Sequence, residues 1–417
     1  MISSISVRNF KSVKDVTLGL GRVNVLIGAN GCGKSNILEA ILMLGAGIAK
    51  KADRVNLVAR GMRETEPFKY LSMFPLETDD SSDVIAEITA TISESKTDFG
   101  VRVIPNPKGN ELIVTEHWPL FDSVEPSGFL SQLAPQIEDS LAQIDDENVK
   151  KNVRRVLPKL LTSFALSEFV TGHQGTESQM RTGLEKLAKL KAKFSEQLSD
   201  FMIYAPDYAT LRVFEEEGQV LPMGPRGQGL FGLFQKILRE RKDEFKKSLL
   251  DFLNVLDWVQ DVKIPEDLGH GERTLSFQDK YMYDSVWIDQ RTSNEGLLFL
   301  LFYFLLFTSF NTPKFFAIDN VDASFNPKLA TELMRQLVEL AAKHDKQVII
   351  TTHNPALLDG LNLHDENQRL YAISRGESGA TEIERVRPPK AVQGKSLPPK
   401  LSEAFLNGLL GGLPKNF

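Results

Sequence analysis

The chain has 417 residues, of which 42% are hydrophobic and 25% charged, and this composition excludes a disordered, collagen-like or disulfide-stapled protein. The 49 Lys and Arg against 55 Asp and Glu leave a net charge of −6, so any contact with nucleic acid must come from a local patch. The single cysteine, Cys32, excludes internal disulfides and metal sites built from cysteine.

The N-terminal part of the chain is predicted to be mostly β-structure. Strands are expected at Ile2–Val7, around Val16–Leu18 and at Arg22–Ile27, where β-branched residues are dense. Apolar residues recur at helical spacing from Ser35 onward, and residues 83–118 again show the pattern of a β-meander. The first residues lack the charged start and long apolar stretch of a signal peptide, so we expect a cytoplasmic protein.

The middle of the chain changes to helical and charged sequence. Residues 128–200 predict an inserted helical arm, and a strand at Phe201–Tyr204 returns the chain to β-structure. A glycine-rich link, Gly224–Gly232, precedes one long amphipathic helix that is expected to reach about Trp258. This section therefore separates the β-rich N-terminal part of the chain from the part that follows it.

In the third section strands and helices alternate, which is typical of a parallel sheet. Strands are predicted at Thr274–Tyr281, Lys314–Ile318 and Gln347–Thr351, and helices at Glu295–Phe310 and Pro327–His344. The longest apolar run within these has eleven residues, about half of the roughly 20 that cross a bilayer. We therefore predict an α/β protein without membrane contact, divided into a first lobe at 1–125, the arm at 126–200 and a second lobe at 201–417.

A phosphate-binding loop is the clearest motif. The segment Gly28–Ser35 fits the pattern G-x-x-x-x-G-K-[ST] and lies between a predicted strand and a predicted helix. Glycines let successive backbone N–H groups surround a phosphate at the start of the helix, where Lys34 reaches the β- and γ-phosphates and the Ser35 hydroxyl ligates Mg²⁺. The sequence therefore predicts a site for a nucleoside triphosphate with Mg²⁺.

Two later strands end in residues that suit the same site. The apolar strand before Asp319 is typical of the carboxylate that holds Mg²⁺ in such ATPases. The next strand ends at His353, which could hydrogen-bond the γ-phosphate. Each signal is common in isolation. Only together with the phosphate-binding loop at Gly28–Ser35 do Asp319 and His353 indicate a nucleotide site.

Five segments together resemble an ABC-type ATPase head of the RecF and SMC kind, a group that also occurs in OLD-like and Septu-like anti-phage systems. The segments are Ile5–Ser12, Gly28–Asn36, Ser293–Leu297, Ala317–Asn320 and Thr351–Pro355. The resemblance implies a head with a parallel sheet behind the phosphate-binding loop, an antiparallel N-terminal part and an inserted arm. The residues that it implies for ATP are Asn30, Gly31, Cys32, Gly33, Lys34, Ser35, Asn36, Ser293, Glu295 and Gly296.

The same resemblance implies a homodimer of heads. In such families two heads enclose ATP, and the phosphate-binding loop of one faces the signature segment of the other. In this sequence either Ser293 or Asn294 could take the serine position of that signature, followed by Glu295 and Gly296. We expect Mg²⁺ to be held by Ser35 and Asp319.

One position departs from the family pattern. Asn320 stands where these ATPases usually carry a catalytic glutamate, directly after the Mg²⁺ aspartate. An amide can position water but cannot accept its proton. Asp322 is the alternative base, and slow hydrolysis that serves as a switch is the expected result.

The resemblance offers three classes of function. A built-in nuclease is not expected, since only about 60 residues follow His353. A free-standing head that controls a separately encoded nuclease or toxin in anti-phage defence suits the chain best, and a RecF-like repair ATPase acting on DNA ends or gaps is the alternative. Basic groups on helical faces keep nucleic acid open as a partner, although acidic residues are interleaved with them; they are Lys150, Lys151, Arg154, Arg155, Lys186, Lys189, Lys193, Arg239, Arg241, Lys242, Lys246 and Lys247.

Overall fold

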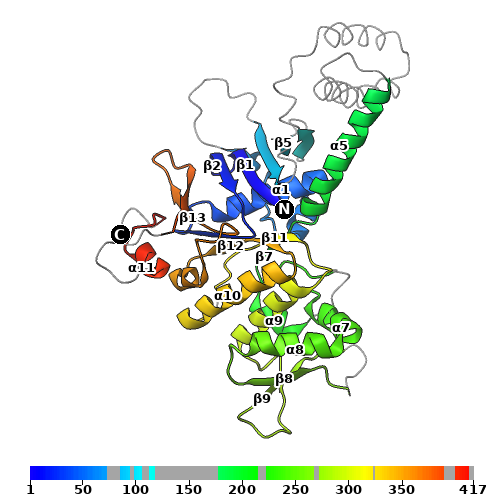
Figure 1. The fold of residues 1–417 in the computed structure, drawn as a ribbon, viewed down its shortest axis with the longest axis vertical. Helices are drawn as coiled ribbons and strands as arrows, with labels where there is room; N and C mark the ends of the chain where they lie inside the picture. The colour runs from blue at the N-terminus through cyan, green and yellow to red at the C-terminus, as the bar shows by residue number, and fades with distance from the viewer. Residues whose placement is uncertain are drawn as a thin grey trace.

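Two large sheets lie on opposite sides of one buried helix. The computed structural model describes residues 1–72, 85–93, 98–105, 112–117, 177–214, 222–266, 272–322, 325–388 and 400–412. Figure 1 shows the first sheet above the central helix α1, the second sheet below it, and a helical layer with a small third sheet at the lower end. Among the described residues, no helix is long and apolar enough to span a bilayer.

The first sheet is antiparallel throughout and has the order β2-β1-β4-β5-β6. Its strands are β1 (Ile2–Phe10), β2 (Val13–Gly19), β4 (Ala86–Ile92), β5 (Asp98–Pro105) and β6 (Leu112–His117). Apolar residues alternate along β4, so that Ala86, Ile88 and Ala90 are buried against α1 while their neighbours are only partly covered. The predicted N-terminal β-structure and meander are therefore confirmed.

The second sheet carries the phosphate-binding loop and has the order β14-β13-β3-β12-β11-β7. All neighbours are parallel except β14, which pairs with β13 in the antiparallel sense. The strands are β3 (Val23–Gly28), β7 (Ile203–Tyr204), β11 (Phe315–Ile318), β12 (Gln347–Thr352), β13 (Gln368–Arg375) and β14 (Thr381–Val386). Every residue of β3, β11 and β12 is buried, as expected for parallel strands covered on both faces.

Helices cover the two faces of this sheet. Helix α1 (Lys34–Ile48) packs on one face, where Ile349 belongs to its apolar cluster, and α9 (Glu295–Thr308) and α10 (Pro327–Lys343) pack on the other with Val348 and Ile350. Helix α9 is apolar all round and buried from Leu297 to Phe307, as expected for a helix enclosed in a protein core. The predicted α/β fold is confirmed.

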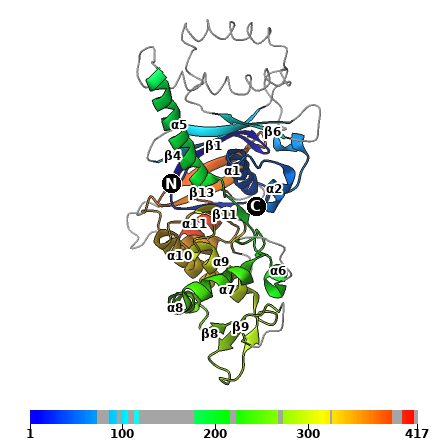
Figure 2. The same cartoon turned by 90° about the vertical axis from the view of Figure 1, so that its right-hand side faces the viewer.

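The described part of the arm is α5 (Glu177–Leu198), which extends away from the head (Figure 2). Its last turns are anchored at α1, because Phe194 and Leu198 are buried and a Cβ on Gly45 would lie 2.3 Å from the Leu198 carbonyl oxygen. The rest of the predicted arm, residues 128–176, lies outside the described residues, as do Lys150, Lys151, Arg154 and Arg155.

The second lobe differs from the sequence prediction in two respects. The prediction of a single long helix before Trp258 is wrong. Two helices, α7 (Leu230–Glu240) and α8 (Lys242–Leu253), meet at Arg241, whose φ of −147° and ψ of 52° end the first helix. A three-stranded antiparallel sheet, β10-β9-β8, was not predicted apart from its middle strand. Its strands are too short for a clear pattern: β8 (Val259–Lys263), β9 (Ser276–Asp279) and β10 (Ile288–Asp289).

Several further elements were also missed by the sequence prediction. They are the helices α2 (Arg54–Ala59) and α6 (Tyr208–Val213), the 3₁₀ turns η1 (Pro67–Tyr70) and η4 (Pro355–Gly360), and the strands β13 and β14. Near the end, α11 (Leu401–Leu406) packs on η4.

Candidate functional site

The loop from Gly28 to Lys34 connects the buried strand β3 to helix α1. Gly31 and Gly33 have φ values of 74° and 111°, which side chains rarely adopt. Gly33 is also closely approached, since a Cβ there would lie 2.0 Å from Thr381 Oγ1, whereas the space around Gly31 is open to 4 Å. The loop therefore needs glycine at Gly33 for two reasons and at Gly31 for one.

Gly33→Ala should destabilise the protein more than Gly31→Ala. Both substitutions force an alanine into positive φ, at about 1–2 kcal/mol each, but only Gly33→Ala adds overpacking against Thr381, typically another ~1–3 kcal/mol. Thermal unfolding of the two variants measures the difference. Equal melting temperatures would contradict the close approach of Thr381 to this loop.

The side chain of Lys34 lies along the inside of the loop. Its Nζ donates to the carbonyl oxygens of Gly28 at 2.7 Å and Ala29 at 3.0 Å, and lies 3.8 Å from Cys32 Sγ. Burial lowers the pKa of Lys34, and the nearby charge of Asp319 opposes that shift. Cys32 is only 2% exposed, so its thiol fills the space behind the loop.

Ser35 and Asp319 come together from different elements. Ser35 lies in the first turn of α1, and Asp319 directly follows β11. Ser35 Oγ donates to Asp319 Oδ2 at 2.9 Å. The hydroxyl of Thr351, near the end of β12, donates to the other carboxylate oxygen, Asp319 Oδ1. The parallel pairing of β11, β12 and β3 brings the carboxyl ends of these strands to one edge, so the fold explains the contact.

This oxygen pair fits Mg²⁺. Magnesium usually takes one or two protein oxygens and completes its shell with water and phosphate oxygens. Among the described residues, no group of three or more His, Cys, Asp or Glu could hold a metal ion by itself. A metal at this edge would therefore depend on the Ser35 hydroxyl, the Asp319 carboxylate and the oxygens of a bound nucleotide.

The candidates for catalysis lie on the same edge. Asn320 has a φ of 56°, is exposed, and donates its backbone N–H to Thr351 Oγ1 at 2.9 Å. Asp322 Oδ1 is buried and has no hydrogen-bond partner. Burial and the charge of Lys34 lower the pKa of His353, while Asp322 and Asp319 oppose this shift. The fold thus brings Asp322 and His353 near Lys34, and places Asn320 beside Thr351 on the same edge.

The remaining residues of the loop are placed differently. Asn30 and Gly31 are exposed, and the Gly31 carbonyl accepts from Arg375 Nε at 2.9 Å. Asn36 is turned away from the loop, because its Nδ2 donates to Ser12 Oγ at 2.6 Å and its Oδ1 accepts from Arg63 Nη2 at 2.6 Å. In this structure Asn36 therefore supports the loop from behind.

Two buried networks that the sequence did not reveal hold the loop in place. In the first, Ser12 Oγ and Thr381 Oγ1 lie 2.7 Å apart, and Thr381 donates to the Cys32 carbonyl at 2.9 Å. In the second, the carboxylate of Glu39 pairs with Lys11 and Arg63. Burial alone would raise the pKa of Glu39, but the hydrogen bonds from Arg63 and the charge of Lys11 hold it below its ordinary value.

Only some of these supporting residues could have been found from the sequence. Lys11, Ser12 and Thr351 lie inside segments that carried the family resemblance, although none had been given a role. Glu39 and Thr381 had no such signal, since a buried carboxylate inside an apolar helix and a threonine on a C-terminal strand acquire their roles only from the tertiary contacts.

The C-terminal segment also touches the loop. The N–H of Ala29 donates to the carbonyl of Gly412 at 3.0 Å. Helix α11 fixes this segment to η4, because the backbone N–H and hydroxyl of Ser402 both donate to the Asp359 carboxylate, at 2.9 and 2.7 Å. The start of the phosphate-binding loop is therefore braced by residues near the other end of the chain.

The signature candidates lie at the start of α9. Ser293 is buried, and its Oγ donates to the Asp289 carbonyl at 2.7 Å. Asn294 is exposed and caps the helix, with its Oδ1 accepting from the Leu297 N–H at 2.8 Å, and Glu295 and Gly296 follow it as half-buried residues of the first turn. Among the residues that the structure describes, no hydrogen bond joins this segment to Gly28–Asn36 within one chain.

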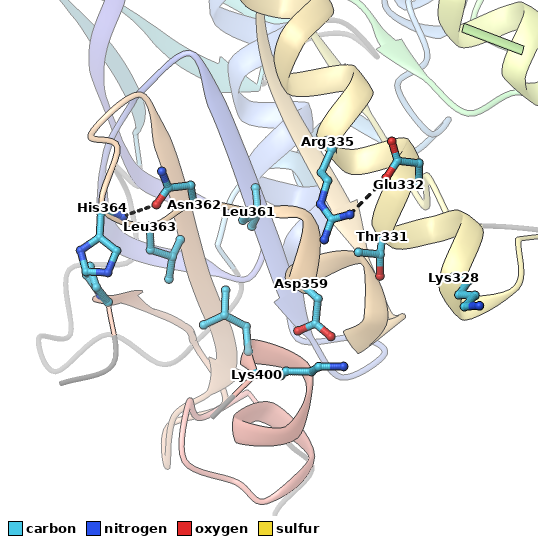
Figure 3. A pocket seen from close by; sticks show the side chains of 12 residues that line it. Lys328, Thr331, Glu332, Arg335, Asp359, Leu361, Asn362, Leu363, His364 and Lys400 are labelled. Carbon is cyan, nitrogen blue, oxygen red and sulfur yellow. Dashed lines mark hydrogen bonds and ion pairs between the residues drawn. The ribbon is translucent and has the colours of Figure 1, made fainter. Parts of the chain in front are cut away.

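A separate groove of about 650 Å³ lies between α10, η4 and the start of α11. Figure 3 shows Lys328, Arg335, Asp359, His364 and Lys400 around it, with Arg335 paired to Glu332. Its lining contains none of the predicted site residues. The groove is therefore distinct from the edge that carries Ser35 and Asp319.

Comparisons with known proteins find ATPase domains that are similar to parts of this chain. Residues 1–198 match the family described as AAA ATPase domain, and residues 284–359 match the one described as AAA domain, putative AbiEii toxin, Type IV TA system. A curated protein of Helicobacter pylori (strain ATCC 700392 / 26695), named ATP/GTP phosphatase, is 24% identical over 163 residues, which are 37% of this chain and 41% of that protein. The chain thus spans less than half of that relative's length.

Solved structures of SMC heads are among those that were found to be similar to this chain. A structure of the SMC head bound to the C-winged helix domain of ScpA superposes with a TM-score of 0.50 at 15% identity, covering 93% of this chain and 97% of the other. The SMC head domain from Thermotoga maritima gives a TM-score of 0.45 at 14% identity, with 93% and 99% covered.

Proposed function

We propose that two copies of this chain enclose ATP with Mg²⁺, hydrolyse it slowly, and thereby control a separately encoded effector. The starting point is that the chain carries AAA ATPase domains and has the fold of an SMC head. The observation that carries the nucleotide part is the 2.9 Å contact between Ser35 Oγ and Asp319 Oδ2 at the start of α1. A hydroxyl and a carboxylate beside a glycine loop are the protein ligands that phosphate-bound Mg²⁺ uses.

The residues of the loop have separate tasks in this proposal. Ser35 and Asp319 would hold Mg²⁺, which when bound offsets phosphate charge. Lys34 would exchange its bonds to the Gly28 and Ala29 carbonyls for bonds to phosphate oxygens. His353, whose pKa is lowered by burial and by Lys34, is neutral at pH 7 and can hydrogen-bond a phosphate oxygen or a water molecule.

Slow turnover follows from Asn320. Its amide can orient water near the γ-phosphate but cannot remove a proton. Asp322, two residues further along the chain, has one buried carboxylate oxygen without a hydrogen-bond partner. A head that binds ATP well and hydrolyses it slowly stays closed for long periods, which suits a switch that restrains or releases a partner.

Closure of two heads is proposed to involve the signature segment of the opposite copy. Gly296→Asp should leave ATP binding by a single head intact and abolish ATP-dependent dimerisation, since it places a negative charge beside phosphate. The variant should fold, because a Cβ at Gly296 would meet only ordinary contacts at 3.6 Å. Light scattering with ATP measures dimerisation.

A matched control is Gly232→Asp. This glycine also lies in a helix, α7, and has no neighbouring atom within 4 Å of a built Cβ, so the same charge is added away from the signature. It should dimerise like the natural protein. Normal dimerisation of Gly296→Asp would mean that the opposite signature does not contact the nucleotide.

The effector is proposed to be a nuclease or toxin of an anti-phage system. The similarity of residues 284–359 to a domain described with the AbiEii toxin supports this class. Co-purification with the products of adjacent genes, with and without ATP, followed by mass spectrometry, tests it. Recovery of a nuclease or toxin supports the proposal, whereas ATP turnover stimulated by DNA ends without any such partner would favour the repair alternative.

A further inference from the structure

Two carbonyl groups of the phosphate-binding loop accept hydrogen bonds from the hairpin formed by β13 and β14. The carbonyl of Cys32 accepts from Thr381 Oγ1 at 2.9 Å, and the carbonyl of Gly31 accepts from Arg375 Nε at 2.9 Å. A loop that surrounds an anion turns its N–H groups inward, so its carbonyls point outward and need donors of their own. The β13–β14 hairpin supplies the donors for these two carbonyls.

The bond from Thr381 fixes the direction of the peptide group between Cys32 and Gly33. In a planar trans peptide the C=O of one residue and the N–H of the next point in opposite directions. Because the Cys32 carbonyl points to Thr381, the N–H of Gly33 points to the other side of the loop. Within the part of the chain that the structure describes, no hydrogen bond uses this N–H. It can therefore donate to a phosphate oxygen.

The hydroxyl of Thr381 is itself oriented by a directional chain of hydrogen bonds. It has one proton, which goes to the Cys32 carbonyl, so the 2.7 Å contact with Ser12 Oγ is a bond that Ser12 donates. Asn36 Nδ2 in turn donates to Ser12 Oγ at 2.6 Å, and the backbone N–H of Thr381 donates to the Ser12 carbonyl at 2.7 Å. Thr381 and Ser12 are only 3% and 7% exposed, so these bonds are shielded from water.

This chain of bonds joins the two large sheets at the loop. Ser12 lies in the turn between β1 and β2 of the first sheet, and Thr381 begins β14 of the second. A Cβ at Gly33 would lie 2.0 Å from Thr381 Oγ1 and 2.8 Å from Ser12 Oγ, so both hydroxyls reach the loop backbone only because Gly33 has no side chain. The direction of the Gly33 N–H therefore depends on a contact between the sheets.

From these contacts we infer that Thr381 is a positioning residue for nucleotide binding: its hydroxyl, oriented by Ser12, holds the Gly33 N–H toward the phosphates. The inference rests on the proposed function for the presence of ATP in the loop. It adds a residue from the C-terminal part of the chain to those that determine ATP affinity.

The test compares two substitutions of Thr381. Thr381→Val replaces the hydroxyl by a methyl group of similar size and should weaken ATP binding by about 2- to 10-fold, which corresponds to one neutral hydrogen bond. Thr381→Ser keeps the hydroxyl and should restore most of the affinity. Titration calorimetry with ATP and Mg²⁺ measures both variants, at a temperature where thermal unfolding shows each to be folded.

Three further measurements distinguish positioning from a loss of stability. Thr312→Val removes another buried hydroxyl, which donates to the Leu306 carbonyl at 2.7 Å, and should bind ATP like the natural protein. At saturating ATP, hydrogen exchange in a peptide that contains Gly33 should be slowed less in Thr381→Val than in Thr381→Ser. Ser12→Ala removes the donor to Thr381 and should also weaken ATP binding, so it carries the test where Thr381→Val does not fold.

The outcomes separate this inference from the proposed function. Failure of the natural protein to bind ATP overturns both. Unchanged ATP affinity in Thr381→Val and Ser12→Ala, or equal losses in Thr381→Val and Thr381→Ser, overturns the positioning role and leaves the proposed function standing. A loss in Thr381→Val that Thr381→Ser restores, with normal ATP binding by Thr312→Val, supports the positioning role.

Discussion

Lys34→Ala should lower ATP affinity by about 10- to 100-fold. Hydrogen bonds to charged groups contribute roughly 1.5–3 kcal/mol each, and every ~1.4 kcal/mol corresponds to a factor of ten. The ammonium of Lys34 is already positioned inside the loop by the carbonyls of Gly28 and Ala29, so little ordering is required when phosphate arrives. Titration calorimetry with ATP and Mg²⁺ measures the loss.

The control must separate binding from folding, since removal of Lys34 also leaves two loop carbonyls without their donor. Thermal unfolding of Lys34→Ala shows whether the head remains folded at the temperature of the titration. Lys51→Ala removes an exposed lysine just after α1 and should bind ATP normally. An unchanged affinity in a folded Lys34→Ala protein would count against the assignment of the nucleotide site.

Asn320→Glu should raise the rate of ATP hydrolysis, because a positioned general base typically contributes about 10²–10⁴-fold. The variant supplies a proton acceptor and leaves Ser35 and Asp319 unchanged. Single-turnover measurement of phosphate release, together with the lifetime of the closed dimer, tests it. A shorter lifetime should accompany the faster reaction, since each turnover would open the heads.

The backbone conformation at Asn320 affects which substitutions can be made there without strain. Its φ of 56° is left-handed, a conformation that Asn and Asp tolerate and that costs other side chains about 1–2 kcal/mol. Asn320→Glu is therefore strained, whereas Asn320→Asp supplies a carboxylate without that strain but with a shorter reach. A gain in Asn320→Glu but not in Asn320→Asp would show that reach to the attacking water decides.

Asp322 provides the competing account. If its half-buried carboxylate is the base, Asp322→Asn should reduce hydrolysis sharply and Asn320→Glu should change it little. A natural protein that hydrolyses ATP quickly, and loses this activity only at Asp322, would defeat the slow switch. The two variants therefore distinguish the mechanisms with the same assay.

The parts of the fold predictable from sequence were those with a local signal. The buried strands at β3, β11 and β12, the apolar helix α9 and the glycine loop each carry their pattern within a few residues, and the resemblance to an SMC-type head that they suggested is confirmed by the similarity in fold. The meeting of Ser35 and Asp319 was also foreseeable, since parallel strands end on one edge.

Other features had no local signal. The division between α7 and α8 depends on one residue, Arg241, in a segment whose apolar spacing continues through it. The supporting roles of Thr381, Glu39 and Gly412 arise from contacts across long sequence separations. The sequence shows that Asn320 replaces the usual catalytic glutamate. Its left-handed backbone, which Asn tolerates better than most residues, is seen only in the structure.

The neighbours of β3 have a consequence for the folding of the chain during its synthesis. This strand lies between β12 and β13, and the loop after it is bonded to Gly412, so its partners emerge from the ribosome more than 300 residues later. Such long-range pairings make folding slow, and an apolar strand must wait unpaired in the meantime. A nascent chain released only as far as α5 carries the entire glycine loop but lacks both strands that hold it. The nucleotide site therefore forms late, only after β12, β13 and Gly412 have been made.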